Sequence, residues 1–356
     1  MNDANSASVS VVTPVYNGAE FLAECIESVL AQTYTNWNYT IVNNCSTDET
    51  LAIAQKYAAK DSRIRVVTND RFRGIVENHN HTARMISPDS KYCKFVFADD
   101  WIYPNCLSEM VGLAEQNPSV GLVGAYTIDG CSVRWHGPPY PSRKVSGREM
   151  CRRQLLGGPY VFGTMTSLLV RCDLIRKRER LFNEQHLQPD LETCFDLLQE
   201  SDFGFLHQVL SFGRERQGAD FFSANINGQR LADFIIFLKY GRALLKPDEY
   251  ERRWKQVRRE YHRILAHNVL RFRPKEFWQY HTDVVASFGG KIDRWLLAQS
   301  VIADVGSHLL HPFNAVRQGR RWWSGRVRRA DGERVAKFQK SKSENLTSAG
   351  ERSERA

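Results

Sequence analysis

The regular alternation of short apolar runs with helical stretches over residues 8–98 is the feature that most constrains the fold. The first helical stretch repeats its apolar residues three and four positions apart, as an amphipathic helix does. Strands that alternate with helices of about ten to fifteen residues are typical of βαβ units and a parallel sheet. The sequence therefore predicts an α/β fold. The predicted strands are residues 8–13, 39–42, 64–68 and 92–98, and the predicted helices are residues 21–30, 49–59 and 75–86.

Polar loops follow three of the predicted strands. They are residues 14–18, residues 43–48 and the pair Asp99-Asp100. In a sheet of this kind, ligands bind at the edge formed by the carboxyl ends of the strands. We therefore expect all three loops to open on the same edge.

Asp99 and Asp100 end the apolar run FVFA, which otherwise reads as a buried strand. A solvated turn or a helix N-cap is the ordinary explanation for such a pair. Their position at the ligand-binding edge favours a second explanation, because carboxylate oxygens suit Mg²⁺ or Mn²⁺ and such ions are usually shared with substrate phosphates. The pair thus points to a nucleoside diphosphate.

The chain can form a substantial core, since it has 356 residues of which 42% are hydrophobic. Its start, MNDANSASVS, lacks the basic and apolar regions of a signal peptide, and no run reaches the roughly 18 apolar residues of a membrane span. The eight cysteines are scattered singly, which favours free thiols in a reducing cytosol. We therefore expect a cytoplasmic location, with the cytoplasmic face of the membrane as a peripheral site.

The basic charge is concentrated after residue 220. Residues 221–356 carry 27 Lys and Arg against 14 Asp and Glu, whereas residues 1–220 carry 22 against 26. Such an excess suggests an anionic partner, either phospholipid or nucleic acid. We expect four regions: a polar N-terminus (1–7), a ligand-binding domain (8–220), a basic helical region (221–330) and a disordered tail (331–356).

Two segments of the basic region combine arginines with aromatic residues. Residues 248–271 place Tyr250, Trp254 and Tyr261 on one helical face and basic residues on the remainder. Residues 317–329 mix arginines with two tryptophans. Both patterns resemble interfacial membrane anchors, and a solvated face over an ordinary helical bundle explains them equally well.

Three motifs, TPVYNG, IVNNCSTDET and FVFADDWIYPN, in this order and spacing resemble those of the family 2 glycosyltransferases. The resemblance covers roughly residues 8–216. In that family the first two loops hold the nucleoside, and the short acidic motif holds the metal that bridges the diphosphate of a sugar nucleotide. The resemblance implies a GT-A nucleotide-sugar-binding fold with a helical C-terminal extension, and Mn²⁺ or Mg²⁺ as cofactor.

The resemblance also implies a role for each motif residue. Pro14 and Tyr16 flank the base. Asn44 stands where the family's uracil-reading aspartate usually stands. Asp100 is the direct metal ligand, and Asp99 contacts the ribose or donor sugar and shares the metal motif.

Two departures from the family pattern bear on these roles. Asn43-Asn44-Cys45 replaces the commoner acidic form of the second motif. An Asn carbonyl still accepts a hydrogen bond from the uracil imide, so a UDP-sugar remains the expected donor, although the amide end could read another base. Phe97 stands where many members carry a further aspartate, so metal binding falls on Asp99 and Asp100 alone.

An inverting transfer needs a base to take the proton of the acceptor hydroxyl. The family supplies an aspartate at the start of a helix, after a turn that resembles Phe182-Asn183-Glu184, and this implies Asp190 as the base. A helix N-terminal cap is the structural alternative for Asp190. Glu192 is the second candidate for the base.

Four further residues are weaker candidates. Arg73 could reach the base or the diphosphate, and a solvated loop arginine is the alternative. Asn80 matches a position in the family's third helix. Arg214 and Arg216 lie where the family often places a basic residue near the diphosphate, and surface charge is an equal alternative.

Two functions remain open from the sequence. The first is an inverting, metal-dependent transfer of sugar from a nucleotide donor to a saccharide or lipid-linked acceptor, in cell-surface polysaccharide or glycolipid assembly, with no nucleic acid as partner. The second is a catalytically silent protein of the same fold whose basic region holds membrane or nucleic acid. A dehydrogenase is disfavoured, because no G-x-G-x-x-G follows the first strand.

Overall fold

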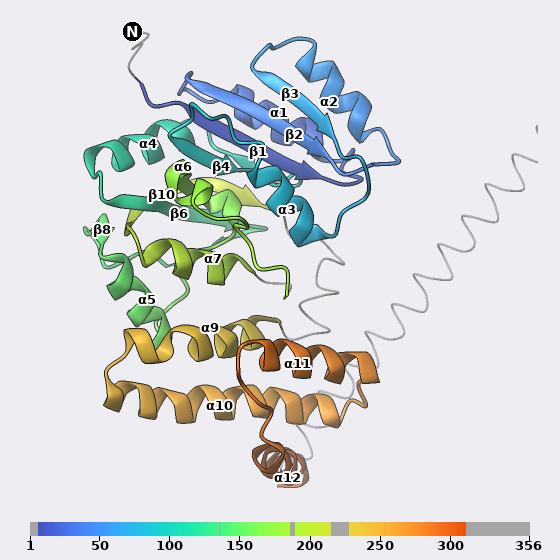
Figure 1. Ribbon diagram of the computed structural model, residues 1–356, viewed down its shortest axis with the longest axis vertical. Helices are drawn as coiled ribbons and strands as arrows, with labels where there is room; N and C mark the ends of the chain where they lie inside the picture. The colour runs from blue at the N-terminus through green and yellow to red at the C-terminus, as the bar shows by residue number, and fades with distance from the viewer. Residues whose placement is uncertain (1–5, 135, 186–188, 215–227, 311–356) are drawn as a thin grey trace, which may run out of the picture. The chain divides into compact units, whose positions relative to one another are not determined.

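The computed structural model describes residues 6–134, 136–185, 189–214 and 228–310. The described strands form one ten-stranded sheet in the order β3-β2-β1-β4-β9-β6-β10-β5, with β7 paired to β6 and β8 paired to β10 (Figure 1). The first four strands pair in parallel, whereas β9 runs antiparallel to β4 and β6. The α/β fold expected from the sequence is confirmed. The strands are β1 (Val9–Val15), β2 (Trp37–Asn43), β3 (Ile64–Thr68), β4 (Tyr92–Phe95), β5 (Trp101–Ile102), β6 (Val120–Asp129), β7 (Ser132–Arg134), β8 (Lys144–Val145), β9 (Leu168–Arg171) and β10 (Asp202–Gly213).

Helices cover the sheet and bury its apolar side chains. One large apolar cluster joins α1, α2 and α4 to alternate residues of β1 and β2, such as Val11 and Tyr39. Outside this cluster, α3 contacts β1 and α7 contacts β6. Parallel strands covered on both faces are apolar throughout, and all seven residues of β1 are buried. The helices are α1 (Leu22–Leu30), α2 (Thr50–Ala58), α3 (Ile75–Ala83), α4 (Cys106–Gln116), α5 (Gly147–Leu155), the 3-10 turn η1 (Met165–Ser167), α6 (Cys172–Arg176), α7 (Pro189–Leu198), α9 (Gly228–Leu244), α10 (Pro247–Val269), α11 (Lys275–Ser287) and α12 (Arg294–Leu310).

The strand β4 is shorter than the predicted strand 92–98, since it ends at Phe95. Val96 and Ala98 are nevertheless buried, and the Val96 N–H donates to the Val12 carbonyl at 3.0 Å. The apolar run therefore continues as a buried loop after the regular ladder ends. The turn η1 leads directly into β9, and all three of its residues are buried.

The chain divides into two compact units, Met1–Ile264 with Arg273–Ile292, and Leu265–Phe272 with Asp293–Ala356. The first holds the sheet, α9, most of α10, and α11; the second holds the end of α10 and α12. Among the described helices, none combines the length and apolarity that a membrane span requires. Arg216 and the segments 317–329 and 331–356 lie outside the described residues, so their interpretations stay predictions.

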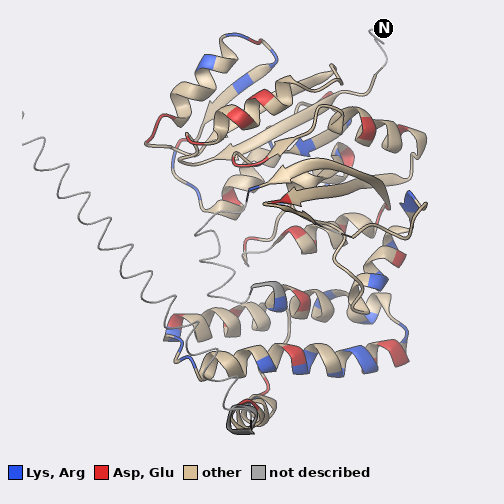
Figure 2. Ribbon diagram, turned by 180° about the vertical axis from the view of Figure 1, so that it is seen from behind, with Lys and Arg blue, Asp and Glu red and all other residues tan. Residues whose placement is uncertain are grey.

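The aromatic face of α10 is packed inside the first unit. Trp254 stacks on Phe234 and Phe237 of α9, with ring centroids 5.7 and 5.9 Å apart. Tyr261 stacks on Phe234 at 4.5 Å. Figure 2 shows acidic and basic residues interleaved along the same helix. These contacts favour the helical-bundle explanation of residues 248–271 over a membrane anchor.

Candidate functional site

The loops that follow β1 and β2 are tied together by hydrogen bonds between backbone and side chains. The Gly18 N–H donates to Thr50 Oγ1 at 2.9 Å, and the Ala19 N–H donates to Asp48 Oδ2 at 3.1 Å. The Thr50 N–H donates in turn to Asp48 Oδ1 at 3.0 Å. The two loops that the sequence places at one edge of the sheet are therefore in contact.

Asp48 carries the charge in this contact. Burial alone would raise the pKa of its carboxyl group, but the hydrogen bonds from Thr50 and from the Ala19 N–H bring that pKa below its usual value. The group is therefore ionised at neutral pH, and its charge strengthens the hydrogen bonds that hold both loops.

The first loop needs special backbone geometry at two residues. Asn17 has a φ of 48°, a left-handed conformation that Asn tolerates, and its Oδ1 accepts a hydrogen bond from the Thr47 N–H at 2.8 Å. At Gly18, an added Cβ would lie 2.6 Å from Val15 Cγ2 and 3.5 Å from Ala98 Cβ. Glycine thus lets the first loop lie against the residue that precedes the two aspartates.

Asn44 is buried and holds the loop after β3. Its Oδ1 accepts hydrogen bonds from Asn69 Nδ2 at 2.8 Å and from the Arg73 N–H at 2.9 Å, and its Nδ2 donates to the Arg73 carbonyl at 2.9 Å. A carbonyl oxygen has two lone pairs, so these two donors occupy both. The Asn44 oxygen could read a base only after releasing one of these partners.

The guanidinium group of Arg73 is engaged by two acidic neighbours. It lies 2.6 Å from Asp70 Oδ1 and 3.1 Å from Glu77 Oε1. Its Nε is buried and finds no hydrogen-bond partner within the part of the chain that the structure describes. An unpaired buried donor costs about 1–3 kcal/mol, and a ligand oxygen would satisfy it. Arg73 is therefore more than a solvated loop arginine.

Exposed aromatic rings lie beside these loops. Tyr16 is 48% exposed and Phe72 is 56% exposed, and their rings meet edge to face with centroids 4.9 Å apart. Pro14, by contrast, is buried in β1 opposite Val42 of β2. Tyr16 and Phe72 thus offer ring surface to a planar ligand, while Pro14 shapes the strand end beneath them.

Asp100 is only 7% exposed, and neutral groups hold both of its carboxylate oxygens. Thr166 Oγ1 donates to Oδ2 at 2.6 Å, and the Arg214 N–H donates to Oδ1 at 3.3 Å. The Thr166 hydroxyl also accepts a hydrogen bond from the Phe97 N–H at 3.1 Å. Asp99 lies beside Asp100, and its carbonyl accepts a hydrogen bond from Arg214 Nε at 3.3 Å. Thr166 and Arg214 thus fix the acidic motif.

The side chain of Arg214 connects the acidic motif with the first helix. Its guanidinium group pairs with Glu24 of α1 and lies 4.3 Å from the centroid of the Phe21 ring. The contact with the Asp99 carbonyl comes from the same side chain. Arg214 therefore lies at the predicted site and is not merely a surface charge.

A fully buried lysine supports Thr166 from inside the domain. Lys94 Nζ donates to the Thr166 carbonyl at 2.6 Å and lies 3.5 Å from Met110 Sδ. Burial lowers the pKa of Lys94. A buried amine needs a hydrogen-bond partner, so this contact binds Lys94 to the turn η1 that carries Thr166.

The acidic motif has the chemistry of a cation site. Asp99 and Asp100 supply hard oxygen donors, and Mg²⁺ or Mn²⁺ usually takes one or two carboxylates and completes its shell with water and phosphate. The Thr166 hydroxyl and the Arg214 N–H orient the Asp100 carboxylate, and the charge of Asp100 also acts on the buried Lys94. Within the described ranges, no group of three or more His, Cys, Asp or Glu could hold a metal ion. The residues fit an ion shared with a phosphate ligand.

The first turn of α7 carries both candidates for the base, and their surroundings differ. Glu192 is buried; its Oε1 accepts from Lys239 Nζ at 2.6 Å, and its Oε2 accepts from Asn183 Nδ2 at 3.0 Å. Asp190 follows Pro189, the first residue of the helix, and is only partly buried. The ion pair with Lys239 makes Glu192 a structural residue and leaves Asp190 as the more accessible carboxylate.

Asn80 of α3 forms hydrogen bonds with the turn that precedes α7. Its Nδ2 donates to the Phe182 carbonyl at 2.8 Å and to Glu184 Oε1 at 2.9 Å, and its Oδ1 accepts from the Phe182 N–H at 2.8 Å. The neighbouring ring of His79 stacks on Phe97 with centroids 5.0 Å apart. α3 therefore connects the turn before α7 with the end of the acidic motif's strand.

Sequence reasoning missed several supporting residues of this edge. Lys94 gave a visible signal, a charge inside the apolar run YCKFVFA. Thr166, Asn69 and Phe72 gave none, because each lies outside the three motifs. Their contacts depend on how distant segments approach one another in the fold.

Comparison with known proteins agrees with this architecture. Residues 10–178 match the family described as glycosyl transferase family 2. Glycosyltransferase GlyG of Streptococcus pneumoniae is 27% identical over 186 residues, which is 51% of this chain and 60% of GlyG. The chain spans 60% or less of the length of the first curated relatives that it matches.

Solved structures share the fold. S. aureus TarS 1–349 in complex with UDP-GlcNAc has a TM-score of 0.59 at 15% identity, covering 79% of this chain and 80% of that chain. Mannosyltransferase PcManGT from Pyrobaculum calidifontis, in complex with GDP-Man and Mn²⁺, has a TM-score of 0.50 at 14% identity, covering 88% and 83%. Residues 10–178 of the chain thus match glycosyl transferase family 2, and their sheet order, with the loops at its edge, has the GT-A fold.

Proposed function

We propose that this protein is an inverting glycosyltransferase that moves a sugar from a nucleoside diphosphate donor, a UDP-sugar by preference, to an acceptor hydroxyl. The observation that carries the proposal is the close approach of the first loop to the acidic motif, where a Cβ on Gly18 would lie 3.5 Å from Ala98. The family match supports the reaction class. The similarity to TarS and PcManGT, which were solved with UDP-GlcNAc and GDP-Man, supports a nucleotide sugar as donor.

In this proposal the nucleoside lies over the loops after β1 and β2. The base stacks on the exposed ring of Tyr16, with Phe72 beside it, and Pro14 supports the loop from below. Arg73 donates its unpaired Nε–H to a ligand oxygen. Asn44 holds the Arg73 backbone in place.

Asp99 and Asp100 would hold Mn²⁺ or Mg²⁺, which supplies positive charge to the diphosphate as it leaves. Thr166 orients the Asp100 carboxylate by donating to Oδ2. Lys94 holds the Thr166 carbonyl and so fixes the turn on which this depends. Each residue has its orientation set before the ligand binds, which reduces the cost of ordering the site.

Asp190 takes the proton of the acceptor hydroxyl as that oxygen attacks the anomeric carbon from the side opposite the diphosphate. This single displacement inverts the configuration at that carbon. Asp190 lies in the first turn of α7, where the helix dipole interacts favourably with an acidic side chain. We assign the reaction to residues 8–220 and propose a saccharide or lipid-linked acceptor in cell-surface polysaccharide or glycolipid assembly.

Calorimetry and product analysis together test this proposal. UDP should bind the full chain in the presence of Mn²⁺, and Asp100→Asn should weaken this binding strongly at saturating Mn²⁺. Asp190→Asn should keep UDP binding and lose about 10²- to 10⁴-fold of the transfer rate, the usual contribution of a general base. Proton NMR of the product should show inversion at the anomeric carbon.

The matched control is Asp89→Asn, which removes an exposed carboxylate before the start of β4, far along the strand from the acidic motif. It should behave as the wild type in both assays. Absence of metal-dependent binding for UDP, GDP and their sugar conjugates would favour the catalytically silent alternative. Full activity of Asp100→Asn would overturn only the assignment of Asp100 as a metal ligand and would leave the proposed reaction standing.

A further inference from the structure

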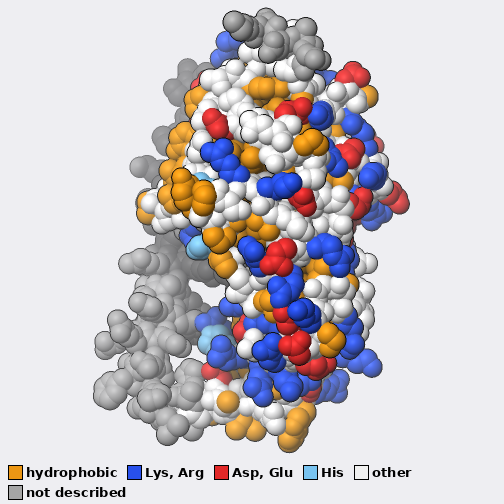
Figure 3. Space-filling view, turned by 90° about the vertical axis from the view of Figure 1, so that its left-hand side faces the viewer, with side chains coloured by type: hydrophobic (Ala, Val, Ile, Leu, Met, Phe, Trp, Pro, Cys, Tyr) orange, Lys and Arg blue, Asp and Glu red, His pale blue; other side chains and the backbone are white. Residues whose placement is uncertain are grey.

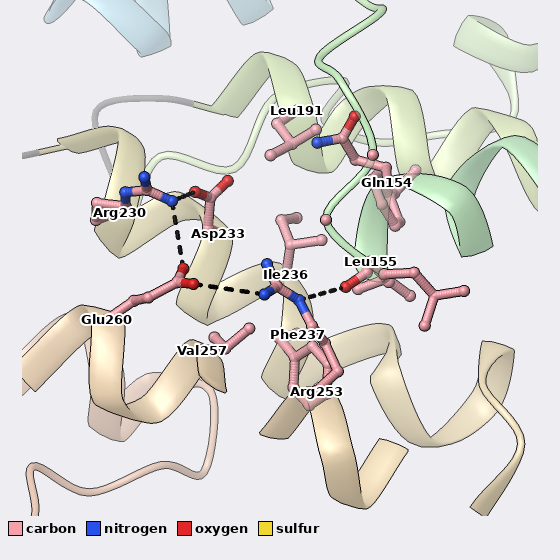
Figure 4. Close-up of a pocket in the computed structure, with 14 residues that line it drawn as sticks. Gln154, Leu155, Leu191, Arg230, Asp233, Ile236, Phe237, Arg253, Val257 and Glu260 are labelled. Atoms are coloured by element: carbon pink, nitrogen blue, oxygen red, sulfur yellow. Dashed lines mark hydrogen bonds and ion pairs between the residues drawn. The ribbon is translucent and has the colours of Figure 1, made fainter. Parts of the chain in front are cut away.

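A cavity of about 350 Å³ lies between α7, the end of α5 and the helices α9 and α10 (Figure 4). All of its lining residues belong to the first compact unit. This volume falls within the range of small-molecule sites, about 300–1,000 Å³. No residue of the three nucleotide-sugar motifs contributes to it, so it is separate from the proposed donor site.

The walls of the cavity combine an apolar surface with charged groups. Leu191 and Phe195 of α7 face it, and α9 and α10 add apolar side chains such as Val257. The polar side chains around it come from Arg230, Asp233, Arg253, Glu260 and Gln154 (Figure 4). Apolar surface accepts the C–H faces of a sugar ring, and planar polar groups both donate to and accept from its hydroxyls. The lining therefore suits a polyhydroxylated ligand.

The charges of the cavity balance one another. Arg230 lies 3.4 Å from both Asp233 and Glu260, and Arg253 lies 3.5 Å from Glu260. The four side chains carry two positive and two negative charges. A phosphate or carboxylate ligand would meet the two carboxylates as well as the two arginines, so the arrangement favours a neutral ligand.

One polar atom at the cavity lacks a partner. Gln154 Oε1 is buried and accepts no hydrogen bond from the residues that the structure describes. In Figure 4 the Gln154 amide lies beside Leu191, on the α7 side of the cavity. A buried acceptor without a donor is costly, and a ligand hydroxyl would satisfy it.

The cavity lies next to the proposed base. Leu191, which lines it, directly follows Asp190 on α7. The pKa of Tyr160 is raised by burial, and the charges of Cys194, Asp190 and Asp233 raise it further. Asp233 belongs to the cavity lining. The cavity and the carboxylate proposed to activate the acceptor are therefore neighbours.

We infer that this cavity is the acceptor subsite and that it holds a neutral saccharide residue. The role of this saccharide as acceptor rests on the proposed function, whereas saccharide binding itself can be measured without a donor. The balanced ion pairs of Arg230, Asp233, Arg253 and Glu260 exclude a charged sugar and hydrogen-bond a neutral one. Gln154 Oε1 accepts a hydrogen bond from one hydroxyl of the saccharide on the α7 side of the cavity.

Saturation-transfer NMR on the full chain, without nucleotide, tests the inference. The probes are the methyl glycosides of glucose, galactose, mannose and N-acetylglucosamine, with glucose 6-phosphate as the charged counterpart. At least one neutral glycoside should receive saturation from the protein, and the phosphate should not. Val257→Phe fills the cavity and should abolish the signal, with thermal unfolding used to confirm that this variant is folded.

Glu260→Gln tests the charge argument in a variant that keeps the size of the side chain. It removes one negative charge, so the neutral glycoside should bind roughly tenfold more weakly, as expected for a lost hydrogen bond to a charged group. The phosphate should gain affinity, because the cavity now carries a net positive charge. Asp248→Asn is the matched control, since it removes an exposed carboxylate paired with Arg252 on the same helix.

The outcomes separate the two proposals. Saturation of no neutral glycoside, wild-type signal in folded Val257→Phe, or preference of the wild type for the phosphate would each overturn the cavity assignment. UDP binding in the presence of Mn²⁺ is measured on the wild type in a separate experiment. Glycoside binding without UDP binding would overturn the proposed function and leave a saccharide site. UDP binding without glycoside binding would overturn the cavity assignment and leave the proposed function standing.

Discussion

At the scale of single residues, the geometry of Asp100 depends on a residue that no motif contains. Thr166 donates to Asp100 Oδ2 at 2.6 Å and accepts from the Phe97 N–H at 3.1 Å. One hydroxyl thus links the carboxylate to the backbone that carries it. The buried Lys94 binds the Thr166 carbonyl, so the link is also fixed from inside the core.

Replacement of Thr166 by Val should therefore weaken metal-dependent nucleotide binding. The change removes the hydroxyl and keeps the shape of the side chain. Loss of a hydrogen bond to a charged group costs about 1.5–3 kcal/mol, so UDP affinity at saturating Mn²⁺ should fall roughly ten- to a hundredfold. Calorimetric titration measures this, and Thr40→Val, which alters a buried hydroxyl on β2, should leave the affinity unchanged. Equal affinity of Thr166→Val and wild type would contradict the argument.

His79 should make stability depend on pH. Burial lowers its pKa from 6.5 to about 4. Between these two values the unfolded chain binds more protons than the folded one, so the free energy of unfolding falls as the pH falls through this window. The loss at pH 4.5 should be about 2–3 kcal/mol, because one pKa unit corresponds to about 1.4 kcal/mol.

The variant His79→Phe separates this contribution from the other acid-sensitive groups. Phenylalanine keeps a ring against Phe97 and cannot be protonated. Urea unfolding at pH 7 and pH 4.5 should show a smaller loss for the variant than for the wild type. The same loss in both proteins would assign the acid sensitivity to other residues.

The sequence predicted which loop residues gather at the edge of the sheet, but not what each one contacts. The alternation of strands and helices is enough to bring the three loops together, because parallel strands end at a common edge. Asn44 illustrates what remained hidden: its oxygen accepts from Asn69 and Arg73, which belong to a loop without a motif. The approach of that loop depends on tertiary packing and not on local pattern.

At the scale of elements, periodic segments were predicted close to their observed bounds. The strand Ile64–Thr68 has the predicted limits, and the helix predicted at 248–271 is Pro247–Val269. The strand predicted to reach residue 98 ends at Phe95, because a buried loop has the same apolar pattern as a buried strand. Hydrogen-bond pairing between strands, which distinguishes the two, leaves no trace in a single sequence.

The partner of an amphipathic helix is equally hidden from its periodicity. The apolar face of α10 predicts burial, but it fits a protein neighbour as well as a membrane. In the structure, Phe234 and Phe237 of α9 cover Trp254. The pattern was interpreted correctly as amphipathic, and only the fold identifies what covers it.

Trp254→Ala should therefore destabilise the protein and leave membrane association unchanged. Removal of a packed tryptophan costs about 3 kcal/mol. Urea unfolding measures the loss, and Trp295→Ala on α12, where the side chain is 73% exposed, should change stability by less than about 0.5 kcal/mol. Unchanged stability of Trp254→Ala together with lost vesicle binding would restore the membrane-anchor interpretation of this helix.

At the scale of the whole molecule, most of the surplus positive charge lies beyond the described residues. The chain has a net charge of +9, and residues 311–356 carry 12 Lys and Arg against 5 Asp and Glu. Figure 3 shows Lys and Arg side chains over α5, α9 and α10 as well, with acidic side chains among them. Interleaved acids cancel much of that field, whereas the segment 317–329 contains six arginines and no acid. We therefore propose that this segment, and not the described surface, attracts anionic lipid.

Vesicle co-sedimentation with two matched variants of the full chain distinguishes these surfaces. The wild type should bind phosphatidylcholine vesicles that contain phosphatidylserine, and 0.5 M salt should release it, because salt screens exposed charges. Glutamine at the six arginines of 317–329 should weaken binding at least a hundredfold, since each basic residue near the surface contributes about 1 kcal/mol. A second variant carries glutamine at six exposed basic residues of the described helices, and loss of binding in this variant alone would assign the lipid contact to those helices. No binding by the wild type would refute a membrane location. The second variant replaces six exposed basic residues of the described helices by glutamine: Arg148, Arg153, Arg242, Lys246, Arg252 and Lys255.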